Sequence, residues 1–289
     1  MKTGVVSLSL GFMDFLDTLR FVKEIGGETI EISTADGVHN KTLDWSDDGR
    51  ISIKDAVKNM GLSIVSVAGY SDFTLPDADL LKKQADGLEW YCQLAADLGV
   101  RFVRVMGGNA KEGVSQAEMV NNIIAGFKQV THIAEKHGVI MALENHGTVV
   151  NDGPTLVKII ESVGSPNLRI TMDTGNFCWA GHSLDEAYDY FRQVAPYTSN
   201  VHLKDFVFEA NNEVKFVPLG EGVLDLGKVK NILVEAGYDG AMLCEYEGMG
   251  DPRVLIAEGI FTQDQFVSEI KSGTERSLVH LRDVMGAGA

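Results

Sequence analysis

The sequence has few cysteines and no long apolar run. Its three cysteines, Cys92, Cys178 and Cys244, are odd in number and show no CxxC spacing. This pattern argues against a disulfide framework and favours a reducing compartment, so we expect a cytoplasmic protein. No window approaches the roughly 18 uninterrupted apolar residues of a membrane span, so we expect no membrane partner.

Positive charge is also scarce, and the start of the chain lacks a signal-peptide pattern. The 25 lysines and arginines stand against 41 acidic residues, giving a formal charge of −16 with no basic run. Because such a surface repels a phosphate backbone, we expect no nucleic-acid partner. Polar residues interrupt the opening "MKTGVVSLSLGFMDF", and no small-residue cleavage site follows, so we interpret it as a first strand.

Short runs rich in Val, Ile and Leu alternate along the chain with longer amphipathic stretches, a pattern typical of βα units and a parallel sheet. We predict eight strands, at residues 4–10, 28–34, 62–69, 101–108, 139–146, 168–176, 200–206 and 241–248. Helices are predicted between them, as in "DADLLKKQADGLEWYCQLAADLG", where a final glycine suits a helix C-cap.

Eight strands with intervening helices, and no Pro/Ser linker between halves, favour one closed barrel. We therefore predict the α/β class and a single (β/α)8 TIM barrel, with residues 1–289 forming one domain. An open doubly wound sheet is the alternative, but no strand is followed by a G-x-G-x-x-G turn.

Four consecutive predicted strands each carry one metal-ligating residue near their ends: Glu144, Asp173, His202 and Glu245. In a TIM barrel the carboxyl ends of the strands form the active site, and alternation along each strand points these side chains inward. Each residue alone is typical of a hydrogen-bonded core or a solvated rim. Four at successive strand ends favour a shared site.

Three carboxylates and one imidazole make an oxygen-rich donor set. Such a set suits one divalent metal ion, Mn²⁺ or Mg²⁺, and tolerates Co²⁺, Ni²⁺ or Zn²⁺. In the strand "SNVHLKDFVF", Lys204 follows His202 at the spacing that keeps both inside, whereas Asp205 would face the surrounding loops. The acidic total counts against a phosphorylated substrate, but Lys204, Arg104 and Arg253 can offset it locally, so phosphate recognition stays open.

The segments "MALENHG", "ITMDTGNF", "VHLKDF", "PLGEGVLD" and "LCEYEG" resemble the xylose isomerase-like TIM-barrel superfamily. This sugar phosphate isomerase/epimerase group includes ketose 3-epimerases, hydroxypyruvate isomerases, inosose dehydratases and endonuclease IV-type apurinic endonucleases. The resemblance spans most of the chain, and the order of its motifs is specific to the superfamily. It does not specify the substrate.

The resemblance implies that Glu144, Asp173, His202 and Glu245 bind the divalent metal and that the two glutamates form the acid/base pair. It makes His146 and Lys204 candidates for substrate contact. Many ketose 3-epimerases have histidine three residues after the metal-binding aspartate, where this chain has Asn176. Asn176 stays a substrate-binding candidate, but the free-ketose branch is weakened. The endonuclease branch is disfavoured, because the additional zinc-binding histidines are missing.

The implied chemistry is proton abstraction next to a sugar carbonyl through a metal-stabilised enediolate. Return of the proton gives an isomerase or epimerase acting on a small sugar or keto-sugar. Loss of a β-hydroxyl from the same intermediate would instead make the protein a dehydratase of keto-sugars or inososes. A noncatalytic carbohydrate-binding barrel is the third hypothesis.

Further candidates lie at other strand ends. Glu31 ends the second strand and is a candidate for binding a substrate hydroxyl, and Trp179 follows the sixth strand and is a candidate wall of the pocket. We interpret "GEGVLD" as a loop that supports the metal site, because Glu221 within it would oppose an anion. The terminal segment 261–289 predicts a closing helix that can reach a neighbouring subunit, so a homo-oligomer stays open.

Overall fold

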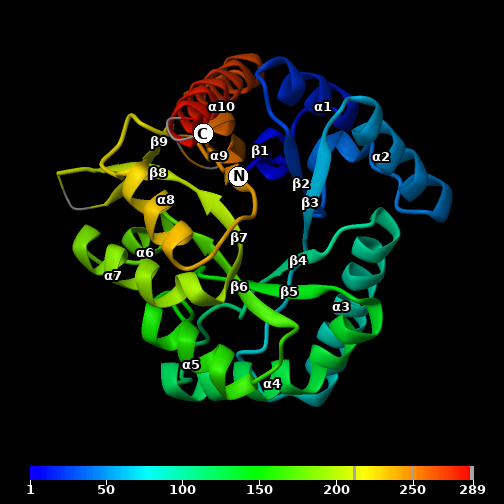
Figure 1. Ribbon diagram of the computed structural model, residues 1–289, viewed down its shortest axis with the longest axis vertical. Helices are drawn as coiled ribbons and strands as arrows, with labels where there is room; N and C mark the ends of the chain where they lie inside the picture. Colours follow the sequence, from blue (N-terminus) through cyan, green and yellow to red (C-terminus); the bar gives the residue numbers. More distant parts are fainter. Residues whose placement is uncertain (211–212, 249, 251, 287–289) are drawn as a thin grey trace.

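The computed structural model describes residues 1–210, 213–248, 250 and 252–286. Eight parallel strands close into a barrel in the order β1-β10-β7-β6-β5-β4-β3-β2, as the sequence predicted (Figure 1). The barrel strands are β1 (Thr3–Val6), β2 (Thr29–Ser33), β3 (Ser63–Ala68), β4 (Phe102–Val105), β5 (Ile140–Glu144), β6 (Leu168–Asp173), β7 (Thr198–Leu203) and β10 (Met242–Cys244).

Helices follow the strands and form an outer ring around the barrel (Figure 1). The ring contains α1 (Phe15–Glu24), α2 (Asp47–Asn59), α3 (Ala78–Leu98), α4 (Gln116–His137), α5 (Gly153–Val163), α7 (Leu184–Val194), α8 (Leu226–Glu235) and α10 (Gln263–Gly286). Two shorter helices, α6 (Asn176–Trp179) and α9 (Pro252–Ala257), follow β6 and β10. No helix in the described part of the chain combines the length and apolar composition needed to cross a membrane.

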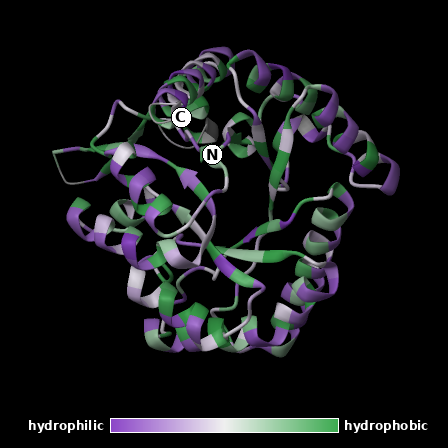
Figure 2. Cartoon of the chain, in the orientation of Figure 1, coloured by the Kyte–Doolittle hydropathy of each residue, from purple (hydrophilic) through white to green (hydrophobic). Residues whose placement is uncertain are grey.

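Two of the long outer helices end at a glycine, as the sequence predicted for the segment 77–99. The side chains of Asp77 and Ser115 cap the first turns of α3 and α4, and Gly99 and Gly138 end these helices at φ of 75° and 67°. Positive φ at a helix end strains other residues but not glycine. Hydrophilic residues gather on the outer side of the ring in Figure 2, so each helix buries its apolar face on the barrel.

The main differences from the predicted strands are that the first and the seventh strands end earlier than expected. The predicted strand 200–206 is divided, because β7 ends at Leu203 and Asp205 begins β8 (Asp205–Phe208). β8 pairs antiparallel with β9 (Val214–Val217) in a separate hairpin. The predicted strand 4–10 is also too long, because Ser7–Leu10 forms a 3-10 helix, η1.

The change of structure at Ser7 has a visible cause. The backbone N–H of Ser33 donates to Ser7 Oγ at 2.9 Å, so a side-chain oxygen receives the bond that a continuing strand would give to its backbone. The Ser7 hydroxyl lies 3.0 Å from His39 Nε2, and His39 Nδ1 lies 3.2 Å from the Met13 carbonyl. Since a carbonyl only accepts, Nδ1 carries the proton and the Ser7 hydroxyl donates to Nε2.

This buried histidine leads to a prediction about stability and pH. Burial lowers the pKa of His39 from 6.5 to about 4, although its bond to the Met13 carbonyl opposes the shift. Between pH 6.5 and about 4, His39 is therefore protonated in the unfolded chain but neutral in the folded protein. Because the unfolded state binds more protons, the free energy of unfolding should fall as the pH drops through this range. The total loss from this residue would be about 3 kcal/mol at most.

The measurement is urea unfolding at several pH values for the wild type and for His39→Asn. Asparagine tolerates the positive φ of 53° at this position and does not titrate. The difference in unfolding free energy between the two proteins should change across this pH range. A constant difference would show that His39 titrates alike in both states.

Candidate metal centre and active site

The four side chains predicted to share a metal converge inside the barrel. Glu144, Asp173, His202 and Glu245 each offer one ligand atom, and these atoms all lie within 4.8 Å of one another. All four residues are buried, with exposed fractions of 5% or less. The spacing is therefore compatible with one small cation held by all four.

Strand register explains the convergence. Asp173 of β6 lies beside His202 of β7, and His202 lies beside Leu243 of β10. Glu245 follows two residues after Leu243, just beyond the end of β10, so alternation turns it to the same side of the sheet. The ligand atoms thus come from four adjacent positions of the barrel, at the ends that form active sites in this fold.

Three of the converging atoms form no hydrogen bond among the described residues: Asp173 Oδ2, His202 Nδ1 and Glu245 Oε2. Lys204 Nζ nevertheless lies 3.4 Å from each of the two oxygens. An unsatisfied buried polar group costs about 1–3 kcal/mol. A divalent cation on these atoms would satisfy them together, and the donor set of three carboxylates and one imidazole fits such an ion. The residues present therefore fit a metal.

Asp173 is held so that one oxygen stays available. Its Oδ1 accepts from the backbone N–H groups of Gly175 and Asn176 at 2.8 and 3.0 Å. Its own N–H donates to Asn145 Oδ1 at 2.7 Å. Burial raises the pKa of Asp173 to about 7, which Lys204 opposes and the two nearby glutamates reinforce. An added positive charge at the cluster would oppose this rise.

Arg104 of β4 supplies a fixed positive charge beside Glu144. Its guanidinium is almost fully buried, lies 4.7 Å from the centre of the Tyr70 ring and places Nε 3.4 Å from Glu144 Oε2. Burial raises the pKa of Glu144, but Arg104 and His202 outweigh it and hold this pKa at about 2. Glu144 is therefore ionised near neutral pH.

Lys204 occupies the other side of the acid cluster. Its Nζ lies 3.4 Å from both Asp173 Oδ2 and Glu245 Oε2, and 2.9 Å from Glu247 Oε1. Burial lowers the pKa of Lys204, but the surrounding carboxylates outweigh this effect and raise it well above its ordinary value. The buried ammonium is thus charged and paired, and Lys204 points into the interior as the alternation of the strand predicted.

The neighbouring aspartate, Asp205, faces a surrounding loop, as the sequence predicted. Asp205 is also buried, and its carboxylate accepts from the backbone N–H groups of Gly220, Gly222 and Leu224 at 2.9 to 3.1 Å. These amides belong to the segment "GEGVLD", so Asp205 fixes this loop beside the end of β7. The loop's amides are used internally and do not form a free anion cradle.

Three other residues were predicted to contact the substrate, and they differ in exposure: His146, Trp179 and Asn176. His146 is half-buried and Trp179 is 49% exposed, with ring centroids 6.4 Å apart and planes tilted by 31°, so both are accessible. Asn176 is buried, donates to the Asn145 carbonyl at 2.9 Å and accepts from Lys204 at 3.4 Å.

Glu31 does not lie where a substrate hydroxyl was expected. It is fully buried, and its Oε2 lies 3.0 Å from His202 Nε2, the ring nitrogen opposite the one that faces Glu144 and Glu245. The side chain points into the barrel, reaches β7 on another side of it and contacts the imidazole of His202.

Sequence reasoning missed three residues of the site. Asn145 ties β5 to β6, Asn200 contacts Glu31, and Glu247 pairs with Lys204. Asn200 and Glu247 sit two residues from His202 and Glu245, so strand alternation gave a signal that was not used. Of the cations considered for phosphate, Arg104 and Lys204 are paired with acids, and the Arg253 side chain lies outside the described residues.

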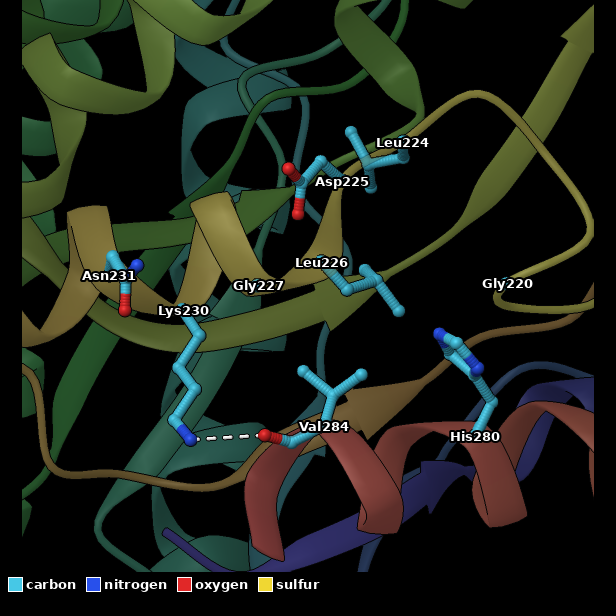
Figure 3. A pocket seen from close by; sticks show the side chains of 9 residues that line it. All are labelled: Gly220, Leu224, Asp225, Leu226, Gly227, Lys230, Asn231, His280 and Val284. Atoms are coloured by element: carbon cyan, nitrogen blue, oxygen red, sulfur yellow. Dashed lines mark hydrogen bonds between the residues drawn. The ribbon is translucent and has the colours of Figure 1, made fainter. Parts of the chain in front are cut away.

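A separate hollow lies on the outer surface, between α8 and α10 (Figure 3). It measures about 530 Å³, and its lining includes Gly220, Asp225, Lys230 and His280. Lys230 points across it and donates to the Val284 carbonyl at 3.0 Å. Its cation therefore ties the two helices together, and we assign this hollow no catalytic role.

The fold and the site define the class of protein. A model of the xylose isomerase-like TIM barrel family matches residues 19–265. Since this match covers most of the chain, the protein belongs to that family.

Similar proteins include two sugar epimerases. The chain is 26% identical over 259 residues to L-ribulose-5-phosphate 3-epimerase UlaE of Escherichia coli (strain SE11), covering 84% of this chain and 87% of that protein. Among solved structures, it resembles the IOLI protein with a bound zinc atom at a TM-score of 0.77 and 17% identity, covering 99% of both chains. It also resembles D-psicose 3-epimerase crystallised in the presence of D-fructose, at a TM-score of 0.75 and 18% identity, covering 99% of this chain and 100% of that one.

Proposed function

We propose that the protein is a divalent-metal-dependent sugar or sugar-phosphate epimerase or isomerase, with Glu144 and Glu245 as its acid/base pair. The observation that carries this proposal is the convergence of three carboxylates and one imidazole, with unsatisfied buried atoms facing a common point. The similarity to sugar epimerases supports the substrate class.

The metal would be held by Glu144, Asp173, His202 and Glu245. When bound, a divalent cation supplies Lewis-acid stabilisation of the charge that develops on a substrate oxygen as the neighbouring proton leaves. Mn²⁺ or Mg²⁺ suits the oxygen-rich set best, and Co²⁺, Ni²⁺ or Zn²⁺ is tolerated.

The two glutamates reach the site from different sides. β5 and β10 are separated in the barrel by β6 and β7, so Glu144 and Glu245 flank the space between them. One carboxylate takes the proton next to the carbonyl. For epimerisation, the other carboxylate returns a proton to the opposite face of the same carbon. For isomerisation, a proton is delivered to the neighbouring carbon instead.

The remaining residues would bind and orient the sugar. Lys204 and Asn176 lie beside Asp173 within hydrogen-bond range of each other, so they can contact a hydroxyl oxygen near the reacting carbon. His146 and Trp179 would form one wall of the mouth. Their paired rings give an apolar face against which a sugar ring or chain can lie.

Solvent isotope exchange tests this function directly. The protein with Mn²⁺ is incubated in D₂O with D-fructose, D-tagatose, D-psicose, L-ribulose 5-phosphate and keto-inositols, and deuterium at carbon is measured by NMR. We expect exchange next to the carbonyl of at least one substrate. Exhaustive chelation should abolish the exchange and added Mn²⁺ should restore it; exchange that survives chelation would contradict the metal-dependent mechanism.

The products of the same reaction distinguish the alternatives. A new ketose epimer or an aldose supports epimerase or isomerase chemistry, whereas loss of water supports the keto-sugar dehydratase. Binding of a sugar without exchange across the whole panel would favour a noncatalytic carbohydrate-binding barrel. Comparing free and phosphorylated ketoses also tests whether a phosphate is recognised.

A further inference from the structure

The imidazole of His202 has a buried carboxylate on each side. Its Nδ1 lies 3.1 Å from Glu245 Oε2 and 3.4 Å from Glu144 Oε1, within the cluster of candidate metal ligands. Its Nε2 lies 3.0 Å from Glu31 Oε2. The function proposed above uses the first side of the ring and leaves Glu31 without a role.

Three donors meet on one oxygen of Glu31. Ser66 Oγ and Asn200 Nδ2 contact Glu31 Oε2 at 2.5 and 3.0 Å, in addition to His202 Nε2. An ionised carboxylate only accepts hydrogen bonds, so Nε2 must carry a proton to bind it. A neutral imidazole then presents its lone pair at Nδ1, the atom that faces the ligand cluster.

Backbone pairing does not bring Glu31 and His202 together. Glu31 belongs to β2 and His202 to β7, and β1 and β10 lie between these strands around the barrel. The contact therefore crosses the interior, and both side chains are 0% exposed. A buried carboxylate is costly unless it is paired, so this contact is a specific arrangement of the interior.

We propose that Glu31 is a positioning residue that holds His202 with Nε2 protonated and Nδ1 directed at the divalent cation. Ser66 and Asn200 in turn hold Glu31. This inference rests on the proposed metal site, and it assigns a role to the first half of the barrel, from which none of the four candidate ligands comes. Outer carboxylates that orient a metal-binding histidine typically account for 10- to 100-fold in metal affinity.

The test compares Glu31→Gln with the matched variant Glu89→Gln by calorimetric titration of Mn²⁺ into chelator-treated protein. Glu89 forms the same kind of contact, 2.8 Å from His137 Nε2, but lies on α3 at the surface. We expect the Mn²⁺ dissociation constant to rise about 10- to 100-fold in Glu31→Gln and to stay unchanged in Glu89→Gln. Equal constants in the two variants would overturn the proposal.

A spectroscopic readout separates positioning from general destabilisation. In the Zn²⁺-loaded wild type, the His202 Nε2 proton should be shifted far downfield in NMR by its bond to a carboxylate, and this shift should decrease in Glu31→Gln. An unmoved signal would overturn the proposal. If Glu31→Gln fails to fold, Ser66→Ala keeps the carboxylate but removes one anchor, and a smaller loss of Mn²⁺ affinity is expected; no loss would count against it.

Titration of the wild type shows whether the proposed metal site fails or only the proposed role of Glu31. If wild-type protein does not bind Mn²⁺ or Zn²⁺, the proposed function fails. If the wild type binds the metal and Glu31→Gln binds it equally well, only the role of Glu31 fails.

Discussion

Glu245→Gln is expected to remove turnover while the barrel stays folded. Glutamine has nearly the same shape, but its amide neither takes up a proton nor carries the negative charge that faces His202 and Lys204. Loss of a general acid or base typically lowers kcat by 10²- to 10⁴-fold. Because Glu245 is also a candidate metal ligand, we expect a loss of about 10³-fold or more.

Solvent exchange with the best substrate of the panel, at saturating Mn²⁺, measures this loss. The matched control is Glu235→Gln at the C-terminal end of α8, where the side chain is exposed and far from the strand ends that carry the cluster. Circular dichroism should show the same fold in both variants. Exchange at the wild-type rate in Glu245→Gln would remove this residue from the mechanism.

Lys204→Met should destabilise the metal-free protein and also remove activity. The ammonium is buried between Asp173, Glu245 and Glu247, so its loss leaves these carboxylates without their nearest cation. Breaking a buried ion pair by removing one partner costs about 3–5 kcal/mol. A divalent cation would replace part of the missing charge, so Mn²⁺ should stabilise the variant more than it stabilises the wild type.

Urea unfolding with and without Mn²⁺ measures the loss of stability and the stabilisation by the metal. Lys228→Met is the matched control, because Lys228 lies over the Tyr188 ring at 3.6 Å, as Lys204 lies near the Phe216 ring, but is exposed. An exposed cation–π contact contributes about 0.5–1 kcal/mol. Unfolding free energies that fall equally in both variants, with equal responses to Mn²⁺, would contradict this account of Lys204.

The barrel could be predicted from sequence because local signals agreed with one another. Amphipathic segments such as 78–98 and 116–137 carry a capping residue at one end and a glycine at the other. The hairpin of β8 and β9 could not be predicted in the same way. Its first strand begins two residues after β7 ends, and the break depends on Asp205, whose partners lie 15 to 19 residues further along the chain.

The convergence of the four candidate ligands was also predictable, because one strand end per βα unit determines it. The contacts that side chains make across the interior of the barrel could not be predicted. Alternation turned Glu31 and Arg104 inward, but which carboxylate each would meet depends on side-chain reach inside the closed barrel. Glu31 was therefore expected at a substrate hydroxyl, although the structure places it against His202.

The closed ring also determines what a fragment of this protein could do. A half-barrel containing β5 to β10 would carry all four donor residues, but it would lack Arg104 beside Glu144 and Glu31 beside His202. Glu144 would lose the positive charge of Arg104, and His202 would lose its contact with Glu31. The smallest unit able to organise the centre is thus both halves together, joined either in one polypeptide or by complementation of two.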